Sequence, residues 1–287
     1  MIGRIVKIVS KEYTVLREDN ERKLAILMGK VRQQKTPLAG DFVEFDEIDG
    51  RYTIQRVMER KNRLIRPAVA NVDQALIVMS IKDPDFSTSL IDRLSILIKH
   101  EDIEPILVVT KCDLGISEEV ENWIQEYERG PMKVIRTSKA ELDPSLASIL
   151  KDKISVLTGQ SGAGKSTLLN VLNPAFKLRT QEISKALGRG KHTTRHNELH
   201  EVAGGLVADT PGFSSIDFNH ISKDNLAQCV MDFEPYIGHC KFNDCIHQNE
   251  PGCKIKEAVD NNVIPRTRYE NYLSVLEMIQ SRKEKYL

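Results

Sequence analysis

Neither sign of charge is in excess in this sequence: 41 Lys and Arg residues balance 41 Asp and Glu residues among 287. The net charge of the whole chain therefore does not indicate a class of binding partner. It also lacks any run of about 18 apolar residues, the length that a membrane-spanning helix needs. The first ten residues, MIGRIVKIVS, lack the apolar core of a signal peptide. We expect a soluble, cytoplasmic protein with no membrane partner, monomeric when free.

Cysteine is scarce and odd in number: there are five, and four of them lie in or near one short stretch, residues 229–253. In a chain without a secretory signal, this distribution favours metal binding over disulfides. Aromatic residues make up only 6% of the chain, and the first sixty residues show no dense platform for stacking single-stranded bases. Apolar residues make up 40%, which is enough for packed cores in two or three domains.

Residues 1–62 are predicted to form an OB-fold β-barrel that binds RNA. Apolar and polar residues alternate in five short runs separated by turn sequences: IGRIVKIV, YTVL, LAILMG, DFVEF and RYTIQRV. An SH3-like barrel or a sandwich is the alternative. Residues 1–66 contain 15 Lys and Arg against 10 Asp and Glu, a mild excess that suits a phosphate backbone. Residues 61–71, KNRLIRPAVAN, have the composition of a basic linker.

Residues 63–219 alternate between strand and helix patterns, which predicts a parallel, doubly wound α/β sheet. Strands are expected at QALIVMSI (74–81), PILVVT, ISVLTG (154–159) and GGLVA, and helices near residues 90–98 and 117–129. Residues 220–287 are mostly helical around a Cys/His loop. A stripe of large apolar residues there is expected to pack in a core rather than to bind a partner: Tyr269, Tyr272, Leu273, Leu276 and Ile279.

The sequence GQSGAGKS at residues 159–166 is a complete phosphate-binding loop between an expected strand and an expected helix. Its backbone N–H groups and the helix N-terminus are expected to hold nucleotide phosphates. Lys165 would bridge the β- and γ-phosphates in catalysis, and the Ser166 hydroxyl would bind Mg²⁺. The residues expected to contact the nucleotide are Gly159, Gln160, Ser161, Gly162, Ala163, Gly164, Lys165, Ser166 and Thr167.

The motif DTPG, residues 209–212, follows an apolar strand some forty positions after the phosphate loop. Asp209 is placed to reach Mg²⁺ through water, and the Gly212 amide suits the γ-phosphate. Between the two motifs, GRGKHTTRH (188–196) is the expected switch loop, in which Thr193 or Thr194 completes the Mg²⁺ shell. A plain basic surface loop is the alternative interpretation.

The tetrapeptide TKCD, Thr110 to Asp113, indicates a guanine base. Asp113 would accept hydrogen bonds from guanine N1–H and the N2 amine, a pair of donors that adenine lacks. Lys111 would lie along the base plane, while Ser138 and Lys139 belong to a TSK sequence whose backbone approaches guanine O6. The usual first residue of the tetrapeptide is Asn, so Thr110 predicts weaker anchoring of this loop. ATP is the alternative nucleotide.

Hydrolysis by the isolated protein is expected to be slow. Ras-type enzymes place a glutamine after the DTPG-type motif to orient the attacking water, whereas this chain has Phe213. His192 in the expected switch loop is the candidate that orients or deprotonates water, with a contact to phosphate or RNA as the equal alternative. The residues expected to act in catalysis are therefore His192, Lys165 and Thr194. Gly162 stands where potassium-activated GTPases carry Asn, so no specific K⁺ requirement is expected.

Cys240, Cys245, His247 and Cys253 give the spacing C-x₄-C-x-H-x₅-C, four candidate ligands within fourteen residues. Tetrahedral Zn²⁺ binds Cys₃His sets, and a closed set of four predicts one structural ion that folds its module. Two alternatives stay open. The thiols could meet by chance, or His239 could replace His247 as the histidine ligand.

The motifs occur in the order base reader, TSK, phosphate loop, switch and DTPG. An ordinary Ras-like chain begins with the phosphate loop, so this order indicates a circularly permuted α/β P-loop GTPase. Together with the N-terminal barrel and the C-x₄-C-x-H-x₅-C spacing, the permuted order resembles the RsgA family, also called YjeQ or YloQ. The resemblance covers nearly the whole chain and implies a multidomain protein: an OB-fold (1–62), a permuted GTPase domain (63–219) and a mostly helical zinc module (220–287).

The resemblance also implies a function. Members are bacterial GTPases that act late in assembly of the small ribosomal subunit, bind 16S rRNA near the decoding region and are stimulated by the subunit. It implies GTP or GDP, Mg²⁺ and one Zn²⁺ as cofactors, with residues 110–113, 159–166 and 192–194 in the family's nucleotide-binding roles. The alternative is a GTP-gated RNA-binding clamp in which hydrolysis is incidental. Phe213 favours the clamp, whereas His192 and the Mg²⁺ ligands favour the enzyme.

Overall fold

The computed structural model of the protein describes residues 1–29, 36–65, 67–139, 143–173, 197–208 and 216–283. The chain divides into two compact units. The first comprises residues 1–75, 144–157 and 165–212, and the second comprises residues 76–143, 158–164 and 213–287. The chain first passes between them within strand β8 (Gln74–Ser80). The three domain bounds expected from the sequence stay a prediction.

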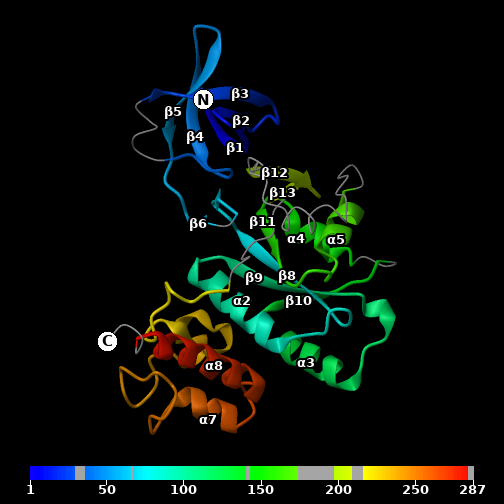
Figure 1. Cartoon of the computed structure of the whole chain (residues 1–287), viewed down its shortest axis with the longest axis vertical. Helices are drawn as coiled ribbons and strands as arrows, with labels where there is room; N and C mark the ends of the chain where they lie inside the picture. Colours follow the sequence, from blue (N-terminus) through cyan, green and yellow to red (C-terminus); the bar gives the residue numbers. More distant parts are fainter. Residues whose placement is uncertain (30–35, 66, 140–142, 174–196, 209–215, 284–287) are drawn as a thin grey trace. The chain divides into compact units, whose positions relative to one another are not determined.

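Five strands at the start of the first unit form a closed barrel (Figure 1). They are β1 (Ile2–Val9), β2 (Glu12–Leu16), β3 (Arg22–Leu27), β4 (Phe42–Ile48) and β5 (Arg51–Val57). Their order is β1-β2-β3-β5-β4, and a pairing of β1 with β4 closes the barrel. Neighbours are antiparallel except β3 and β5, which are parallel. This closed five-stranded arrangement confirms the predicted OB-fold.

The barrel is held together by the inward faces of its strands, because successive side chains of a strand point to opposite sides. Phe45 and Tyr52 pack edge to face with ring centroids 5.9 Å apart. The buried residues form one apolar core: Ile5, Tyr13, Val15, Ala25, Val43, Phe45 and Ile54. Each large apolar side chain of this kind contributes about 1.5–3 kcal/mol on burial.

The segment 61–71, expected to be a basic linker, contains a short antiparallel hairpin of β6 (Arg63–Leu64) and β7 (Val69–Ala70). Both residues of β7 are buried, and the Ala70 N–H donates to the carbonyl oxygen of Ala39 at 2.8 Å. The apolar residues that follow Pro67 therefore fix this segment against the barrel. The basic residues of this segment suggested a linker, so its packing was not predicted from the sequence.

Strand β12 (Asn197–Val202) joins the barrel to the remaining strands of the first unit. It pairs antiparallel with β1 and with β13 (Gly205–Ala208), and β13 pairs in parallel with β11 (Ile154–Thr158). Two ion pairs support the junction with the barrel: Lys7 with Glu198 at 2.6 Å and Arg22 with Glu201 at 2.8 Å. The sequence pattern does not predict β12, which begins directly after the expected switch loop.

The second unit has the expected α/β pattern. Strand β9 (Glu104–Thr110) lies between β8 and β10 (Lys133–Arg136), and β9 and β10 are parallel. Helices α2 (Thr88–His100) and α3 (Glu118–Arg129) match the predicted helices. Ser87 and Ser117 cap them by accepting from the N–H groups of Leu90 (3.2 Å) and Val120 (3.3 Å). Helix α4 (Ser145–Leu150) belongs to the first unit.

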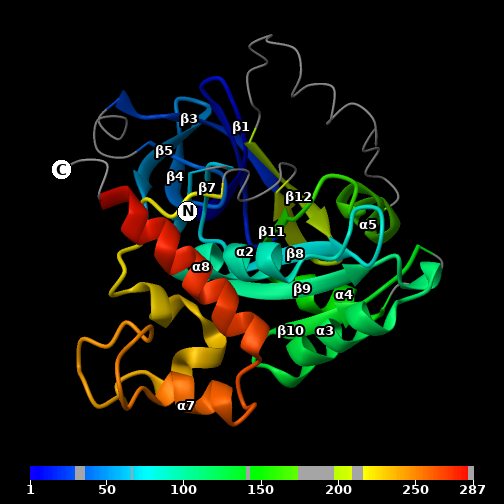
Figure 2. The ribbon, with the colours of Figure 1, turned by 60° about the horizontal axis from the view of Figure 1, so that its bottom comes forward.

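The C-terminal part of the second unit is helical, as predicted. It contains the 3₁₀ helices η2 (Leu226–Cys229) and η3 (Met231–Tyr236) and the α-helices α7 (Lys254–Asp260) and α8 (Arg266–Lys283). Tyr269, Tyr272, Leu276 and Ile279 are buried in one core, and Leu273 packs against it, so the apolar stripe has the packing role expected of it. Helix α8 packs against α2 (Figure 2).

A cluster of buried charged and polar groups lies between α2 and α8. Arg268 pairs with Asp92, and its Nε lies 3.0 Å from Asp232. Asp92 also accepts hydrogen bonds from Tyr127 at 2.8 Å and from Asn271 at 2.6 Å. Burial opposes the charge of Arg268, but Asp92, Tyr127 and Asp232 outweigh it and raise the pKa of the guanidinium. The arginine is therefore charged at every pH at which the protein is folded.

Within the described part of the chain, every helix is too short or too polar to cross a membrane.

Candidate nucleotide site and metal centre

Residues 159–164 lie between β11 and α5 (Lys165–Leu172), and Lys165 and Ser166 begin the helix. This is the strand–loop–helix arrangement that the motif requires. Gly159 has φ +120°, and a Cβ there would collide with the carbonyl oxygen of Val78. Gly162 and Gly164 also have left-handed backbones, with φ of 83° and 96°. Only glycine adopts such conformations at no steric cost. The loop therefore depends on these glycines for its shape.

Thr110 connects the base reader to the phosphate loop. It is buried at the end of β9, and its hydroxyl donates to the carbonyl oxygen of Ala163 at 2.6 Å. A Cβ on Gly164 would lie 3.7 Å from the same hydroxyl oxygen. Thr110 thus contacts the phosphate loop directly, and the weaker anchoring expected from the absence of Asn stays a prediction.

The TKCD and TSK sequences lie side by side. The Cys112 N–H donates to the carbonyl oxygen of Thr137 at 3.3 Å, and the Thr137 N–H donates to that of Val109 at 2.8 Å. Asp113 is exposed within the 3₁₀ helix η1 (Cys112–Leu114). Ser138 and Lys139 follow Thr137, half-buried and exposed respectively. The structure brings together the two segments from which a guanine site was predicted.

Lys111 has a left-handed backbone, φ 60°, and its ammonium group is held by a turn that no sequence motif marks. Its Nζ donates to the carbonyl oxygen of Lys82 at 3.2 Å and to that of Asp83. The turn follows β8 and contains Pro84, whose Cδ would lie 3.6 Å from a Cβ on Gly162. Residues 82–84 therefore border both the base reader and the phosphate loop.

Lys165, the first residue of α5, is half-buried, and this burial lowers the pKa of its ammonium group. Ser166 and Thr167 are half-buried in the same first turn, and Gln160 is half-buried in the loop before it. Ser161 is exposed there. His192, Thr193, Thr194, Asp209, Gly212 and Phe213 lie outside the described residues, so their predicted roles stay predictions.

Removing the Thr110 hydroxyl gives a direct test of the anchor. Thr110→Val keeps the side-chain shape but leaves the Ala163 carbonyl without this donor, and an unmet buried acceptor costs about 1–3 kcal/mol. We expect GDP to bind about tenfold more weakly. Thr110→Ser retains the hydroxyl and serves as the control in the same calorimetric titration. Equal affinities in the two variants would show that the bond does not support the site.

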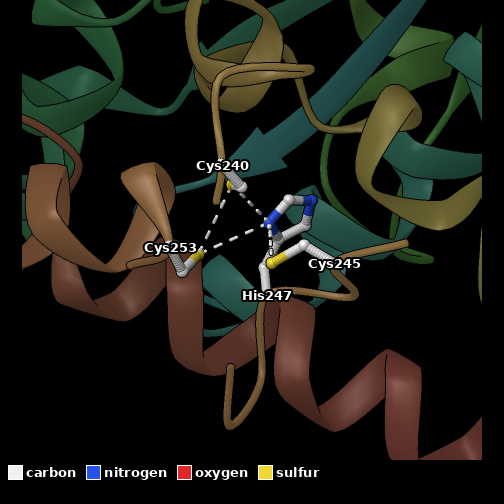
Figure 3. A group of neighbouring side chains, drawn as sticks. All are labelled: Cys240, Cys245, His247 and Cys253. Atoms are coloured by element: carbon white, nitrogen blue, oxygen red, sulfur yellow. Dashed lines mark hydrogen bonds between the residues drawn. The ribbon is translucent and has the colours of Figure 1, made fainter. Parts of the chain in front are cut away.

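Four side chains of the C-terminal module converge on one point (Figure 3). The ligand atoms of Cys240, Cys245, His247 and Cys253 all lie within 4.8 Å of one another. Nδ1 of His247 lies 3.6 Å from Sγ of Cys240 and 3.4 Å from Sγ of both Cys245 and Cys253. The sulfurs of Cys240 and Cys253 are 3.9 Å apart. Tetrahedral Zn²⁺ would separate its ligands by about 3.8 Å between sulfurs and about 3.5 Å between sulfur and nitrogen. The cluster therefore fits one zinc ion.

The surrounding groups fix the loop that carries these ligands. The Lys254 N–H donates to Sγ of Cys240 at 3.4 Å. From helix α8, Tyr269 donates its hydroxyl to the carbonyl oxygen of His247 at 2.8 Å, and Tyr272 donates to that of Ile246 at 2.7 Å. Such contacts hold metal ligands in place before the ion arrives.

Burial sets the protonation state of the ligand groups in the absence of an ion. Burial lowers the pKa of His247 against the opposing charge of Glu250, so its imidazole is neutral and able to bind metal at neutral pH. Burial raises the pKa of Cys245 to about 12, so its thiol is protonated until a cation displaces the proton. All five cysteines are free, and His239 is exposed outside the cluster. His247 is therefore the histidine of the Cys₃His set.

A closed β-barrel, an α/β sheet whose phosphate loop follows its guanine-type motif, and a Cys₃His module together define a circularly permuted P-loop GTPase. The family model described as RsgA GTPase matches residues 57–219. The chain belongs to the RsgA GTPase family. It is a GTP hydrolase, and its family implies GTP, GDP and Mg²⁺ as its ligands.

Similar proteins span its whole length. The chain is 46% identical to Small ribosomal subunit biogenesis GTPase RsgA 2 of Oceanobacillus iheyensis over 291 residues, and 43% identical to RsgA of Bacillus subtilis over 296, with 99% of each chain covered in both. Among solved structures, YloQ, a circularly permuted GTPase, is 36% identical with a TM-score of 0.85, covering 98% of this chain and 95% of its own. YjeQ from Thermotoga maritima has the same identity and TM-score, covering 97% and 98%.

Proposed function

We propose that this protein hydrolyses GTP during late assembly of the small ribosomal subunit in the cytoplasm, binding 16S rRNA as a monomer and being stimulated by the subunit. The observation that carries the proposal is 46% identity over 99% of the chain to a relative named as a small-subunit biogenesis GTPase. That span includes the barrel, the nucleotide motifs and the four metal ligands.

The nucleotide site acts by holding phosphates and base in fixed positions. The phosphate-loop N–H groups and Lys165 stabilise negative charge on the β- and γ-phosphates, while Asp113 accepts from guanine. The Ser166 and Thr194 hydroxyls would hold Mg²⁺, with Asp209 reaching it through water, and the ion would supply positive charge to the phosphates. The Gly212 amide is proposed to contact the γ-phosphate. The Cys₃His cluster has no open position for chemistry, so its zinc ion is structural.

The attacking water is oriented by His192. Phe213 occupies the position of the catalytic glutamine in Ras-type enzymes and offers no hydrogen bond to water. An imidazole can orient or deprotonate water. We therefore assign slow turnover to the free protein and fast turnover to its complex with the small subunit.

The connection between β12 and the barrel supports a link between nucleotide state and RNA binding. β12 begins at Asn197, one residue after the expected switch loop, and pairs with β1. The ion pair of Lys7 with Glu198 lies at this pairing. We propose that hydrolysis at the nucleotide site acts on the RNA-binding barrel through this strand.

The deciding experiment measures GTP turnover by the purified protein, alone and with small ribosomal subunits. Large subunits and ATP serve as controls. Stimulation in related GTPase systems reaches about 10³–10⁵-fold, and we expect a rise of this order with small subunits only. His192→Ala should abolish the stimulation while GTP affinity stays unchanged.

The alternative, a GTP-gated RNA-binding clamp, makes a different prediction. Small subunits would then bind tightly in the presence of GTP without accelerating turnover. Phe213 is the residue that favours this function. If small subunits still stimulated GTP turnover by His192→Ala, the protein would act as a GTPase, but His192 would have no part in its mechanism.

The lowered pKa of Lys165 predicts a pH dependence of nucleotide binding. Burial lowers this pKa in the free protein, and a bound phosphate raises it by attracting the ammonium. Affinity for GDP is therefore highest below the free-state pKa of Lys165 and falls as the pH rises through it. Guanine also loses its N1 proton in alkaline solution, so the comparison is with Lys165→Arg, which keeps its charge. We expect a steeper alkaline loss of affinity in the wild type, measured by calorimetry, and parallel profiles would contradict it.

A further inference from the structure

The turn of residues 80–84 lies at the end of strand β8 and contains a completely buried serine. The Ser80 hydroxyl donates to the carbonyl oxygen of Pro84 at 2.8 Å and so closes the turn. The backbone of Asp83 is left-handed, with φ 48°. A hydrogen bond across such a short segment restricts where its intervening carbonyl groups point.

Those intervening carbonyl groups hold the ammonium group of Lys111. Nζ donates to Lys82 O at 3.2 Å and also to Asp83 O. The long side chain of a lysine loses much rotational freedom when it is fixed, and fixing it before a ligand arrives lowers the cost of binding. The turn thus holds the lysine of the base-reading tetrapeptide in one place.

The same turn contacts the two neighbouring parts of the site. The Ile81 N–H donates to the carbonyl oxygen of Thr110 at 3.2 Å. Pro84 borders Gly162 in the phosphate loop, at 3.6 Å from where a Cβ would be. Base reader and phosphate loop therefore meet at a segment that belongs to neither motif.

We infer that Ser80 is a positioning residue for guanine nucleotide binding, which acts by closing the turn that holds Lys111. The inference rests on the proposed role of residues 110–113 as the guanine reader. Ser80 does not touch the nucleotide. It sets the orientation of two carbonyl groups, and these carbonyl groups set the place of the lysine that lies along the base.

The test is the affinity for GDP, measured by calorimetry on the full-length protein with its zinc. Ser80→Ala removes the donor and weakens GDP binding about tenfold, which is about 1.4 kcal/mol. Ser80→Thr retains a hydroxyl, so its GDP affinity stays within about threefold of the wild-type value, a difference of about 0.7 kcal/mol or less. The matched control is Ser95→Ala, a buried serine on α2 that faces Arg268 and Tyr272 instead of the turn. This control leaves GDP affinity unchanged.

A double variant separates positioning from a general structural effect. If Ser80 acts through Lys111, Ser80→Ala adds no further loss of GDP affinity to Lys111→Met. The single-turnover rate of bound GTP stays at the wild-type value, because the reacting phosphate is not involved. If Ser80→Ala does not fold, Ser80→Cys replaces it, since a thiol is a weak donor.

Two results would overturn the inference: an unchanged GDP affinity in Ser80→Ala, or a full additional loss on the Lys111→Met background. Both require a wild-type protein that binds GDP. A wild-type protein that binds no guanine nucleotide would instead contradict the proposed function, so the two failures are distinguishable.

Discussion

Replacing His247 by alanine is expected to abolish stoichiometric zinc binding and to unfold the C-terminal module. His247 is buried, and its Nδ1 lies 3.4–3.6 Å from all three sulfurs. Structural zinc sites contribute about 10–16 kcal/mol of apparent binding free energy at neutral pH. That is comparable to the whole stability of a typical domain, so its loss leaves the module without its main support. Zinc content by mass spectrometry and thermal unfolding with and without a chelator measure the effect.

The matched control is His239→Ala, which removes a histidine from the same loop. His239 is exposed and lies outside the four-ligand cluster, so this variant should retain one zinc ion and the wild-type melting temperature. A chelator should lower the melting temperature of the wild type and of His239→Ala, but not that of His247→Ala. Full zinc content in His247→Ala would refute the assigned ligand set.

Arg268→Ala is expected to destabilise the second unit by about 3–5 kcal/mol. The substitution leaves the buried Asp92 and the half-buried Asp232 without their cation, and breaking a buried ion pair from one side costs this much. It also removes the guanidinium that stacks on the Tyr127 ring at 4.0 Å. Urea unfolding followed by circular dichroism measures the loss as a lower midpoint with an unchanged slope.

Helix α8 provides its own control, because Arg266 lies only two positions away. Its side chain is 64% exposed and approaches Asp260 at 3.6 Å. Exposed ion pairs contribute little, so Arg266→Ala should leave the urea midpoint unchanged. Equal urea midpoints for Arg268→Ala and Arg266→Ala would show that the buried ion pairs of Arg268 do not stabilise the second unit.

The nucleotide and metal motifs could be predicted because their residues are close together in the sequence. The functional groups of residues 159–166 lie in one loop, and so do those of residues 240–253. The spacing of these residues in the sequence is therefore enough to indicate which ligand each loop binds. The helices at 88–100 and 118–129 were equally accessible, since each begins after a capping serine and shows helical periodicity. Local sequence decides local geometry in all these cases.

Other features depended on residues that lie far apart. Strand β12 has the polar sequence NELHEV, and it is a strand because β1 and β13 pair with it on either side. The hairpin within 61–71 was hidden by its basic composition and is fixed by contact with the barrel. Pairing partners override local propensity in such segments.

The order of the motifs and the four-ligand spacing can be read from the amino-acid sequence, and they are enough to give the class of enzyme. Which groups support those motifs depends on the tertiary fold. Lys111 meets a carbonyl group 29 positions away, and Arg268 meets Asp92 across 176. The physical reason is that a hydrogen bond or ion pair depends on distance in space, and folding alone sets that distance for residues so widely separated in the chain.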